Sequence, residues 1–223
     1  MSFSQRTREE LLVQDIKAPT AKIELMAAFK AIGTLQIDFN SVMIEIKTSQ
    51  IKLTKRILEI LKHDYPEANT QTLVRNVRSF NVDKKSYLIR ITTNAKEILF
   101  DLGLISDVNA NFILSLNDVR DKLVTDEDKR VYARMFFCCT GSVNDPKNAQ
   151  QYHLEIYNSN KEYLEEIQSL TKDYAINFKI TQRKKRYALY LNKSEEIADF
   201  LKFVMASYAL FEFEDYRIKR DMM

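Results

Sequence analysis

The residues of this sequence that could carry out chemistry are few and scattered. His63 and His153 lie far apart, so no histidine cluster is present, and each is interpreted as a solvated or hydrogen-bonded structural residue. Cys138 and Cys139 are adjacent in an apolar run, where their side chains diverge and no spacing resembles a metal clip or a disulfide framework. With only 3 glycines, the chain has no Gly-rich loop that would cradle phosphate. We therefore expect no cofactor and no metal site.

Charged residues near the predicted strands are the other candidates. Carboxylates in a shared site bind divalent metal, but the four acids near the strands are interpreted as solvated strand and turn residues: Asp38, Glu45, Asp145 and Glu155. The densest basic run is RKKR at 183–186, in a predicted hairpin turn. A basic hairpin tip can neutralise phosphates in a salt-dependent way.

Composition sets the limits within which these residues act. At 223 residues with 45% hydrophobic content, the chain can bury roughly 70% of its unfolded surface and needs neither disulfide nor metal. The net charge of +3 arises from 34 basic and 31 acidic residues, so a nucleic-acid role must rest on local patches. The N-terminal 15 residues alternate in charge, unlike a signal peptide, and no apolar stretch reaches the roughly 18 residues of a membrane span. We expect a cytoplasmic protein.

Two glycines mark an internal repeat. Gly33 and Gly141 each end a helical apolar run and begin an extended one, and a left-handed, helix-closing conformation is expected at both. The segment IEIKTS (44–49) resembles LEIYNS (154–159). Helical patterns follow at 50–64 and 160–174. The two halves therefore correspond along their length.

Each half then continues with two strand patterns and a closing helix. The strands are predicted at 72–77 and 86–92 in the first half and at 176–182 and 186–192 in the second. Asn94 and Ser194 precede the closing helices and are expected to cap them. The order predicts an α+β fold of two pseudo-symmetric αββαββα lobes.

This order and its two glycine-ended helices resemble the LAGLIDADG homing-endonuclease fold. The motif falls on LMAAFKAIG (25–33) and ARMFFCCTG (133–141). The resemblance implies that these helices pack closely across a pseudo-dyad, which requires small side chains one turn apart. The residues assigned to that packing are Ala27, Ala31, Gly33, Met135, Cys139 and Gly141, of which Met135 and Cys139 suit it less well.

Further segments resemble one branch of that fold, the WhiA family of sporulation regulators. They are GSVNDP (141–146), YHLEI (152–156) and FEFEDYRIKRDM (211–222), together with the opening MSFS and AKIEL (21–25). The expected organisation is an N-terminal extension plus first lobe at 1–106, a connector at 107–128, a second lobe at 129–209 and the start of a linker helix at 210–223. In that helix Phe211, Asp215 and Ile218 are expected near one face, with Arg217 and Arg220 exposed.

The WhiA family usually continues into a C-terminal helix-turn-helix domain after the last of these segments. We expect that domain to be absent from this chain, as in a piece cut at a domain boundary or in a naturally shortened form. The resemblance implies a DNA-binding transcription regulator with roles in cell division, the cell cycle and chromosome segregation, associated with the nucleoid. Double-stranded DNA is the expected partner, mainly through the helix-turn-helix domain, with regulatory proteins as further partners.

The same resemblance indicates that the chain is not a nuclease. Active LAGLIDADG nucleases carry an acidic residue directly before the terminal glycine of each motif, where the two carboxylates hold divalent metal. This chain has Ile32 and Thr140 at those positions. Neither side chain can replace a carboxylate, so we expect a scaffold without catalytic residues.

The strands of the LAGLIDADG fold imply a saddle whose open face meets DNA. Strand alternation places a polar set on that face, and the candidate DNA-binding residues are Arg75, Arg78, Lys84, Lys85, Arg90, Lys179, Arg183, Lys184, Lys185 and Arg186. Glu45 and Glu155 are expected on the same face, where a carboxylate repels phosphate. The alternative therefore stays open that the chain is a protein-interaction or ligand-sensing scaffold that does not itself contact DNA.

Overall fold

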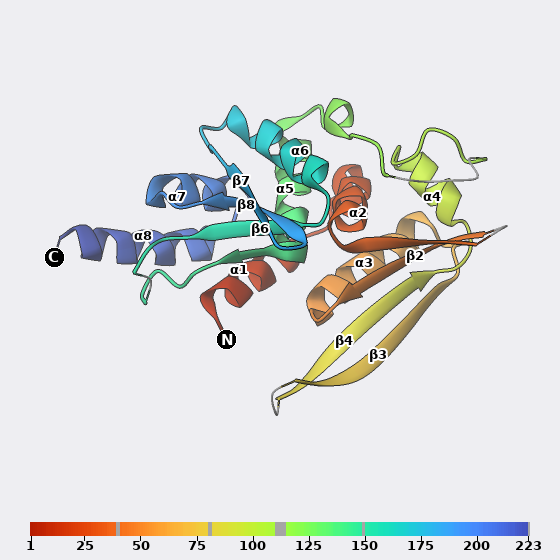
Figure 1. The fold of residues 1–223 in the computed structure, drawn as a ribbon, viewed down its shortest axis with the longest axis horizontal. Helices are drawn as coiled ribbons and strands as arrows, with labels where there is room; N and C mark the ends of the chain where they lie inside the picture. Colours follow the sequence, from red (N-terminus) through yellow and green to blue (C-terminus); the bar gives the residue numbers. More distant parts are fainter. Residues whose placement is uncertain (39–40, 80–81, 110–114, 149, 223) are drawn as a thin grey trace. The chain divides into compact units, whose positions relative to one another are not determined.

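The computed structural model describes residues 1–38, 41–79, 82–109, 115–148 and 150–222, and these residues divide into two compact units. One unit consists of Ile16–Val119; it is called the first lobe below. The other combines Met1–Asp15 with Arg120–Met223 and is called the second lobe. Figure 1 shows the chain coloured along its sequence. The expected organisation grouped residues 1–15 with the first lobe and set residues 107–128 apart as a connector, whereas these units place residues 1–15 with the second lobe and divide 107–128 after Val119.

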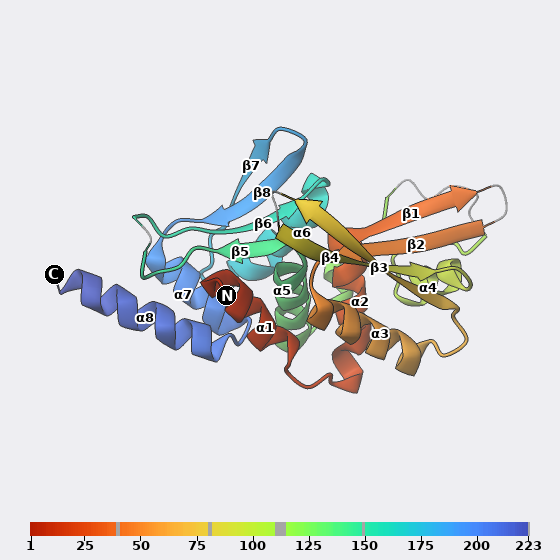
Figure 2. The same ribbon diagram turned by 90° about the horizontal axis from the view of Figure 1, so that it is seen from below.

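The first lobe has the predicted order of helices and strands. Its elements are α2 (Ala18–Ile32), β1 (Gly33–Asp38), β2 (Ser41–Thr48), α3 (Ile51–Asp64), β3 (Thr70–Ser79), β4 (Val82–Ile91) and α4 (Ala95–Asp101). The four strands form an antiparallel sheet in the order β1-β2-β4-β3. In Figure 2 helices α2 and α3 lie on one side of this sheet.

The second lobe repeats that order. A 3-10 turn, η1 (Arg120–Lys122), leads to α5 (Asp126–Thr140), β5 (Gly141–Val143), β6 (Leu154–Asn158), α6 (Lys161–Lys172), β7 (Lys179–Arg183), β8 (Arg186–Leu191) and α7 (Ser194–Phe203). Two further helices belong to it: α1 (Phe3–Leu12) and α8 (Ser207–Asp221). The sheet order is β5-β6-β8-β7, with α5 and α7 on one side in Figure 2. The α+β fold of two αββαββα lobes is thus confirmed.

The pairing of the strands shows which residues of the two lobes are equivalent. Gly33 pairs with Ile46 as Gly141 pairs with Ile156, so the glycines are equivalent. At the other end of the middle strands, Tyr87 pairs with Thr48 and Tyr187 with Asn158. The residues before these tyrosines, Ser86 and Arg186, are therefore equivalent too. Ser86 pairs with Arg75 and Arg186 pairs with Arg183, so Arg75 and Arg183 occupy equivalent positions. The lobes differ in their second hairpin, where β3 and β4 each have 10 residues and β7 and β8 have 5 and 6.

The conformation expected for the two glycines is wrong. Gly33 (φ −74°, ψ 141°) and Gly141 (φ −83°, ψ 154°) are extended, and neither is left-handed. Space explains the residue type instead. A Cβ on Gly33 would lie 3.0 Å from Cα of Phe29, and one on Gly141 would lie 2.6 Å from the carbonyl oxygen of Phe137. Each glycine thus lets a helix pass directly into a strand without a loop.

Helix capping also departs from the sequence expectation. Asn94 is the residue before α4, but it adopts a left-handed conformation (φ 59°) and its side chain makes no cap hydrogen bond. Ser194 is already the first residue of α7, and Lys193 precedes it. Side-chain caps occur elsewhere: Thr125 and Asp128 form a reciprocal capping box at the start of α5. Residue type alone did not locate the helix starts.

The N-terminal helix holds the last helix in place. No side chain of its own flank caps α8, but the Glu10 carboxylate of α1 accepts the amides of Tyr208 (2.8 Å) and Ala209 (3.1 Å). A carboxylate there satisfies otherwise orphan donors and complements the helix dipole. Arg6 adds an ion pair with Glu212 (2.6 Å). These contacts explain why residues 1–15 belong with the second lobe.

The interior of the first lobe contains a buried ion pair. Arg56 of α3 donates from Nε and Nη2 to the two carboxylate oxygens of Glu24 on α2, at 2.5 and 2.6 Å. The side chains are 4% and 1% exposed. A bidentate pair fixes both the distance and the orientation of the two helices, because each charge is costly to bury alone.

The pair generates a prediction about folding stability. Arg56→Met leaves the Glu24 carboxylate buried beside an apolar side chain, so the free energy of unfolding should fall by about 3–5 kcal/mol. Adding Glu24→Leu should restore much of that loss. Urea unfolding followed by circular dichroism measures both. Arg130→Met is the matched control, since Arg130 and its partner Glu127 are 28% and 29% exposed, and it should cost no more than about 1 kcal/mol.

The helix-to-strand junction generates a second prediction. Gly141→Ala forces a Cβ against the backbone of α5, so we expect a loss of about 1–3 kcal/mol in the free energy of unfolding. Ser142→Ala, one residue later, should change it by less than about 0.5 kcal/mol. Thermal melts of the three proteins make the comparison. Equal melting temperatures for Gly141→Ala and the parent chain would contradict the spatial explanation.

Candidate nucleic-acid interface

Each sheet has one face directed to its helices and one that the strand alternation leaves open. In β2 and β6 the buried residues Ile44, Ile46, Leu154 and Ile156 alternate with half-buried ones. The open face therefore carries Glu45 in the first lobe and Glu155 in the second. These two glutamates occupy equivalent positions, because Glu45 pairs with Thr34 and Glu155 with Ser142.

On the open face of the first lobe, Glu45 is held by two neighbours. The Arg90 guanidinium donates from Nε to one carboxylate oxygen at 2.5 Å. The Gln36 amide donates to the other at 2.8 Å. Arg90 is 33% exposed and Glu45 16%. The expected repulsive carboxylate is thus neutralised, and one expected DNA-binding cation is engaged within the protein.

The equivalent glutamate of the second lobe lies at the centre of a larger polar network. Glu155 accepts from His153 Nε2 at 3.0 Å and forms an ion pair with Arg183 at 3.5 Å. The other ring nitrogen of His153 contacts Asn192 Oδ1 at 2.7 Å. The guanidinium carbon of Arg186 lies 3.9 Å from the centre of the Tyr157 ring, a cation–π stack. We call these five residues, His153, Glu155, Tyr157, Arg183 and Arg186, the open-face network.

The network stabilises the charged form of its glutamate. Burial of Glu155 opposes ionisation, but hydrogen bonds from Tyr157 and His153 and the nearby charges of His153 and Arg183 outweigh it and lower the pKa of the carboxyl. Burial and the same hydrogen bond raise the pKa of the Tyr157 hydroxyl. Glu155 is therefore an anion at neutral pH, next to the Arg183 guanidinium and a phenol that donates to it.

The predicted basic residues do not all lie on one face. Those on the open faces are Arg75, Arg90, Lys179, Arg183 and Arg186, as their pairing register requires. Lys184 and Lys185 form the turn between β7 and β8, with Lys184 left-handed at φ 52°. Lys85 pairs with Asn76 and points to the opposite side of its hairpin from Arg75. The side chains of Arg78 and Lys84 lie outside the described residues.

The two positions that a nuclease would fill with acids end the helices α2 and α5. Ile32 and Thr140 are the last residues of these helices. The Thr140 hydroxyl donates to Phe136 O of its own helix at 3.4 Å. Arg8 of α1 donates from Nη1 to Gly141 O at 2.6 Å and so places a cation at the end of α5. Among the described residues, no group of three or more His, Cys, Asp or Glu is arranged to hold a metal ion.

The residues assigned to the pseudo-dyad lie in the final turns of α2 and α5 or directly after them. Ala27 and Met135 are buried, at 0% and 2% exposed, whereas Ala31 and Cys139 are half-buried. The spacing of four residues places each pair on one side of its helix. Their packing against one another stays a prediction.

Two contacts of the open face were not predicted from the sequence. Tyr157 was seen only as part of LEIYNS, although it contacts both Arg186 and Glu155. The link from Arg183 to Glu155 was also missed, because the two residues are distant in sequence. Strand alternation was the signal that could have revealed them. Once the register of β6 and β8 is known, Glu155, Tyr157 and Arg186 all fall on the same face of the sheet.

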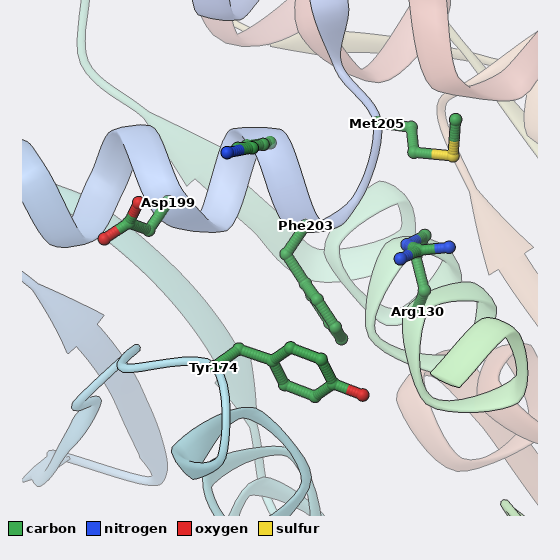
Figure 3. A pocket seen from close by; sticks show the side chains of 6 residues that line it. Arg130, Tyr174, Asp199, Phe203 and Met205 are labelled. Carbon is green, nitrogen blue, oxygen red and sulfur yellow. The ribbon is translucent and has the colours of Figure 1, made fainter. Parts of the chain in front are cut away.

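The second lobe also has a pocket of about 440 Å³ away from the network. Figure 3 draws the six lining residues and labels five of them: Arg130, Tyr174, Asp199, Phe203 and Met205. The rings of Tyr174 and Phe203 are 4.5 Å apart between centroids, and the Tyr174 hydroxyl donates to Asp126 at 2.5 Å. Burial and this hydrogen bond raise the pKa of Tyr174 to about 12. The pocket thus combines an aromatic wall with charged side chains of both signs.

Comparisons with known proteins match both lobes. The family described as the WhiA N-terminal LAGLIDADG-like domain matches residues 19–105, and the WhiA LAGLIDADG-like domain matches residues 129–223. Within the described residues no helix is long and apolar enough to span a membrane.

Solved structures with a similar fold come from two groups. Full-length DUF199/WhiA from Thermatoga maritima superimposes with a TM-score of 0.72 at 20% identity, covering 99% of this chain and 67% of that one. The homing endonuclease I-DmoI in complex with DNA and Mn gives a TM-score of 0.55 at 13% identity, covering 86% and 99%. At these identities the likeness concerns the fold.

Sequence relatives are more similar. A probable cell division protein WhiA of Bacillus licheniformis is 35% identical over 223 residues, which is all of this chain and 68% of the relative. The counterpart in Bacillus subtilis is 33% identical over the same length. Two matched domains in the right order and this identity over the whole chain lead to one conclusion: the chain belongs to the WhiA family.

Proposed function

We propose that this chain is the noncatalytic LAGLIDADG-like part of a DNA-binding transcription regulator that acts in cell division and chromosome segregation at the nucleoid. The observation that carries the proposal is the equivalent placement of Arg75 and Arg183 on the two open faces. Cations at repeat-related positions suit a duplex, whose two phosphate backbones are also related by symmetry. The related fold of I-DmoI occurs in complex with DNA.

The open faces support contact with the DNA backbone rather than a reading of bases. Lys179, Arg183 and Arg186 lie on neighbouring strands of one sheet, and Lys184 and Lys185 extend the basic surface at the hairpin turn. Glu155 reduces the local positive charge and orients Arg183. Such a surface gives modest, salt-dependent affinity. Sequence reading belongs in this proposal to a helix-turn-helix domain of the family.

The absence of catalysis is supported by the chemistry at the helix ends. Ile32 and Thr140 offer no carboxylate for a divalent cation, and hard oxygen ligands are what Mg²⁺ requires. The Arg8 guanidinium at the end of α5 adds a positive charge close to Thr140. A cation at that point disfavours a second one.

A second function is favoured by the internal pairing of the cations. Because Arg90 and Arg183 already bind Glu45 and Glu155, the open faces could serve a protein partner or the lobe could sense a ligand. The pocket in Figure 3, with its aromatic wall of Tyr174 and Phe203, supports the ligand-sensing form. In that form the chain itself would not contact DNA.

Incubation of the chain with supercoiled plasmid and Mg²⁺ tests the absence of catalysis. We expect the plasmid to stay supercoiled, because neither motif supplies a metal-binding acid. An active LAGLIDADG endonuclease with its target plasmid is the positive control. Linear product that forms only with Mg²⁺, and that disappears in Thr140→Lys, would show that the chain is a nuclease after all.

Glu155→Gln separates DNA contact from the scaffold function. Removing this charge and releasing Arg183 should raise the affinity for a 30-base-pair duplex at low salt by about three- to tenfold, the effect of one unit charge near phosphate. Fluorescence anisotropy across a salt series measures it. Glu214→Gln is the matched control, because Glu214 also pairs with an arginine, Arg217 at 2.8 Å, but on α8; its affinity should equal that of the parent.

The same titration tests the basic residues. Replacing Arg183 and Arg186 together by alanine should reduce the slope of log K against log salt by about 2, close to one unit for each phosphate contact. If the parent chain does not bind the duplex even at low salt, the proposed DNA contact is wrong, and the protein-interaction or ligand-sensing function is favoured.

A further inference from the structure

The last helix carries an apolar stripe that nothing in the described chain covers. Tyr208 is 82% exposed, Phe211 70%, Ile218 53% and Met222 81%. Tyr208, Phe211, Asp215 and Ile218 lie on one side of α8, and Met222, the residue directly after the helix, continues their spacing of 3, 4, 3 and 4. We call Tyr208, Phe211, Asp215, Ile218 and Met222 the α8 stripe. Scattered exposed apolar residues are ordinary, but a continuous stripe at this spacing marks an interaction surface.

The stripe belongs to a helix that is firmly held from its other side. Phe213, on the opposite side of α8, is 0% exposed and its ring centroid lies 5.2 Å from that of Tyr152. Arg220 donates to Gln150 O at 2.8 Å and lies over the Tyr152 ring. The Glu10 cap fixes the start of the helix. The stripe is therefore presented on a helix with a fixed orientation, which lowers the entropy cost of binding.

The arrangement of the stripe is nearly symmetric about Asp215. Tyr208 and Met222 lie seven residues on either side of it, and Phe211 and Ile218 lie four and three residues away. Two copies of α8 in antiparallel orientation would therefore match Tyr208 with Met222 and Phe211 with Ile218. Such a self-complementary patch is what a two-fold dimer requires.

The charges of α8 select the same orientation. Ser207–Asp215 carries three acidic side chains, Glu212, Glu214 and Asp215, and no basic one. The following residues of the helix, 216–221, carry three basic side chains, Arg217, Lys219 and Arg220, and one acidic one, Asp221. An antiparallel pair sets the acidic half of each helix against the basic half of the other, whereas a parallel pair sets like against like. We propose that the α8 stripe is a homodimer interface in which two copies of the chain pair through antiparallel α8 helices.

The expected association is weak. A helix of 15 residues is about 22 Å long, and a two-helix contact of this length buries less than the roughly 800 Å² per partner of stable interfaces. Two copies of Asp215 meet near the two-fold axis, where their like charges oppose pairing. We therefore expect a dissociation constant of roughly 10–500 μM, so that dimers form at high local concentration.

Sedimentation equilibrium of the full chain between 5 and 500 μM tests the dimer. The parent should shift from monomer to dimer across this range. Phe211→Asp should weaken association at least tenfold, and Asp215→Asn should strengthen it about three- to tenfold. Val124→Asp is the matched control, since Val124 is 78% exposed but lies outside the stripe; it should leave association unchanged. Circular dichroism melts check that the variants are folded.

Disulfide cross-linking tests the orientation. In a Cys139→Ser background, a mixture of Phe211→Cys and Ile218→Cys chains should form the mixed disulfide in preference to either homodisulfide. Homodisulfides in place of the mixed one would contradict the antiparallel arrangement. A parent chain that stays monomeric at 500 μM, or that instead binds the part of a relative which this chain does not match, would overturn the proposal and assign the stripe to another partner.

Discussion

The direct passage from helix to strand at Gly33 and Gly141 is the constraint on which both lobes depend. A side chain at either position would meet the backbone of Phe29 or Phe137, so any other residue would push the first strand away from the helix that precedes it. That junction sets where β1 and β5 begin, and through the pairing of Gly33 with Ile46 and Gly141 with Ile156 it sets the register of each sheet. It also determines which strand residues face the helices and which face outward.

The outward faces derive their character from two equivalent glutamates. Glu45 and Glu155 do not simply oppose DNA, because each is bound by an arginine of the same face. The side chains of the two arginines differ in exposure: Arg183 is 49% exposed and Arg90 33%. Exposed pairs are worth little in stability, so their main effect is to orient guanidinium groups. The two glutamates thus offset part of the charge of the open-face cations and hold the guanidinium groups of Arg90 and Arg183 in place.

Periodicity and repeat symmetry predicted the fold well. Two αββαββα lobes could be predicted from Gly33, Gly141 and the matched segments at 44–49 and 154–159. The prediction was correct because each half of the sequence shows the same pattern and so supports the interpretation of the other half. Local backbone detail was not predictable: Gly33 is extended as the first residue of β1, and α7 begins at Ser194 itself. Of the candidate site, strand alternation predicted the open-face positions of Lys179 and Arg186, but the pairing of Arg183 with Glu155 depends on side-chain reach across strands.

The second lobe is discontinuous in the chain, and this has a consequence for synthesis. Ile16–Val119 contains every strand and helix of the first lobe, so that lobe can be complete while the rest is still being made. Helix α1 precedes the first lobe in the chain, yet Tyr208 and Glu212, which its Glu10 and Arg6 bind, are synthesised only after both sheets. The apolar residues Phe3 and Leu11 of α1 are 1% exposed in the folded chain. They become buried only as the second lobe forms. Helix α1 can meet α5 through Arg8 and Gly141 earlier, but it completes its contacts only after translation has passed Glu212.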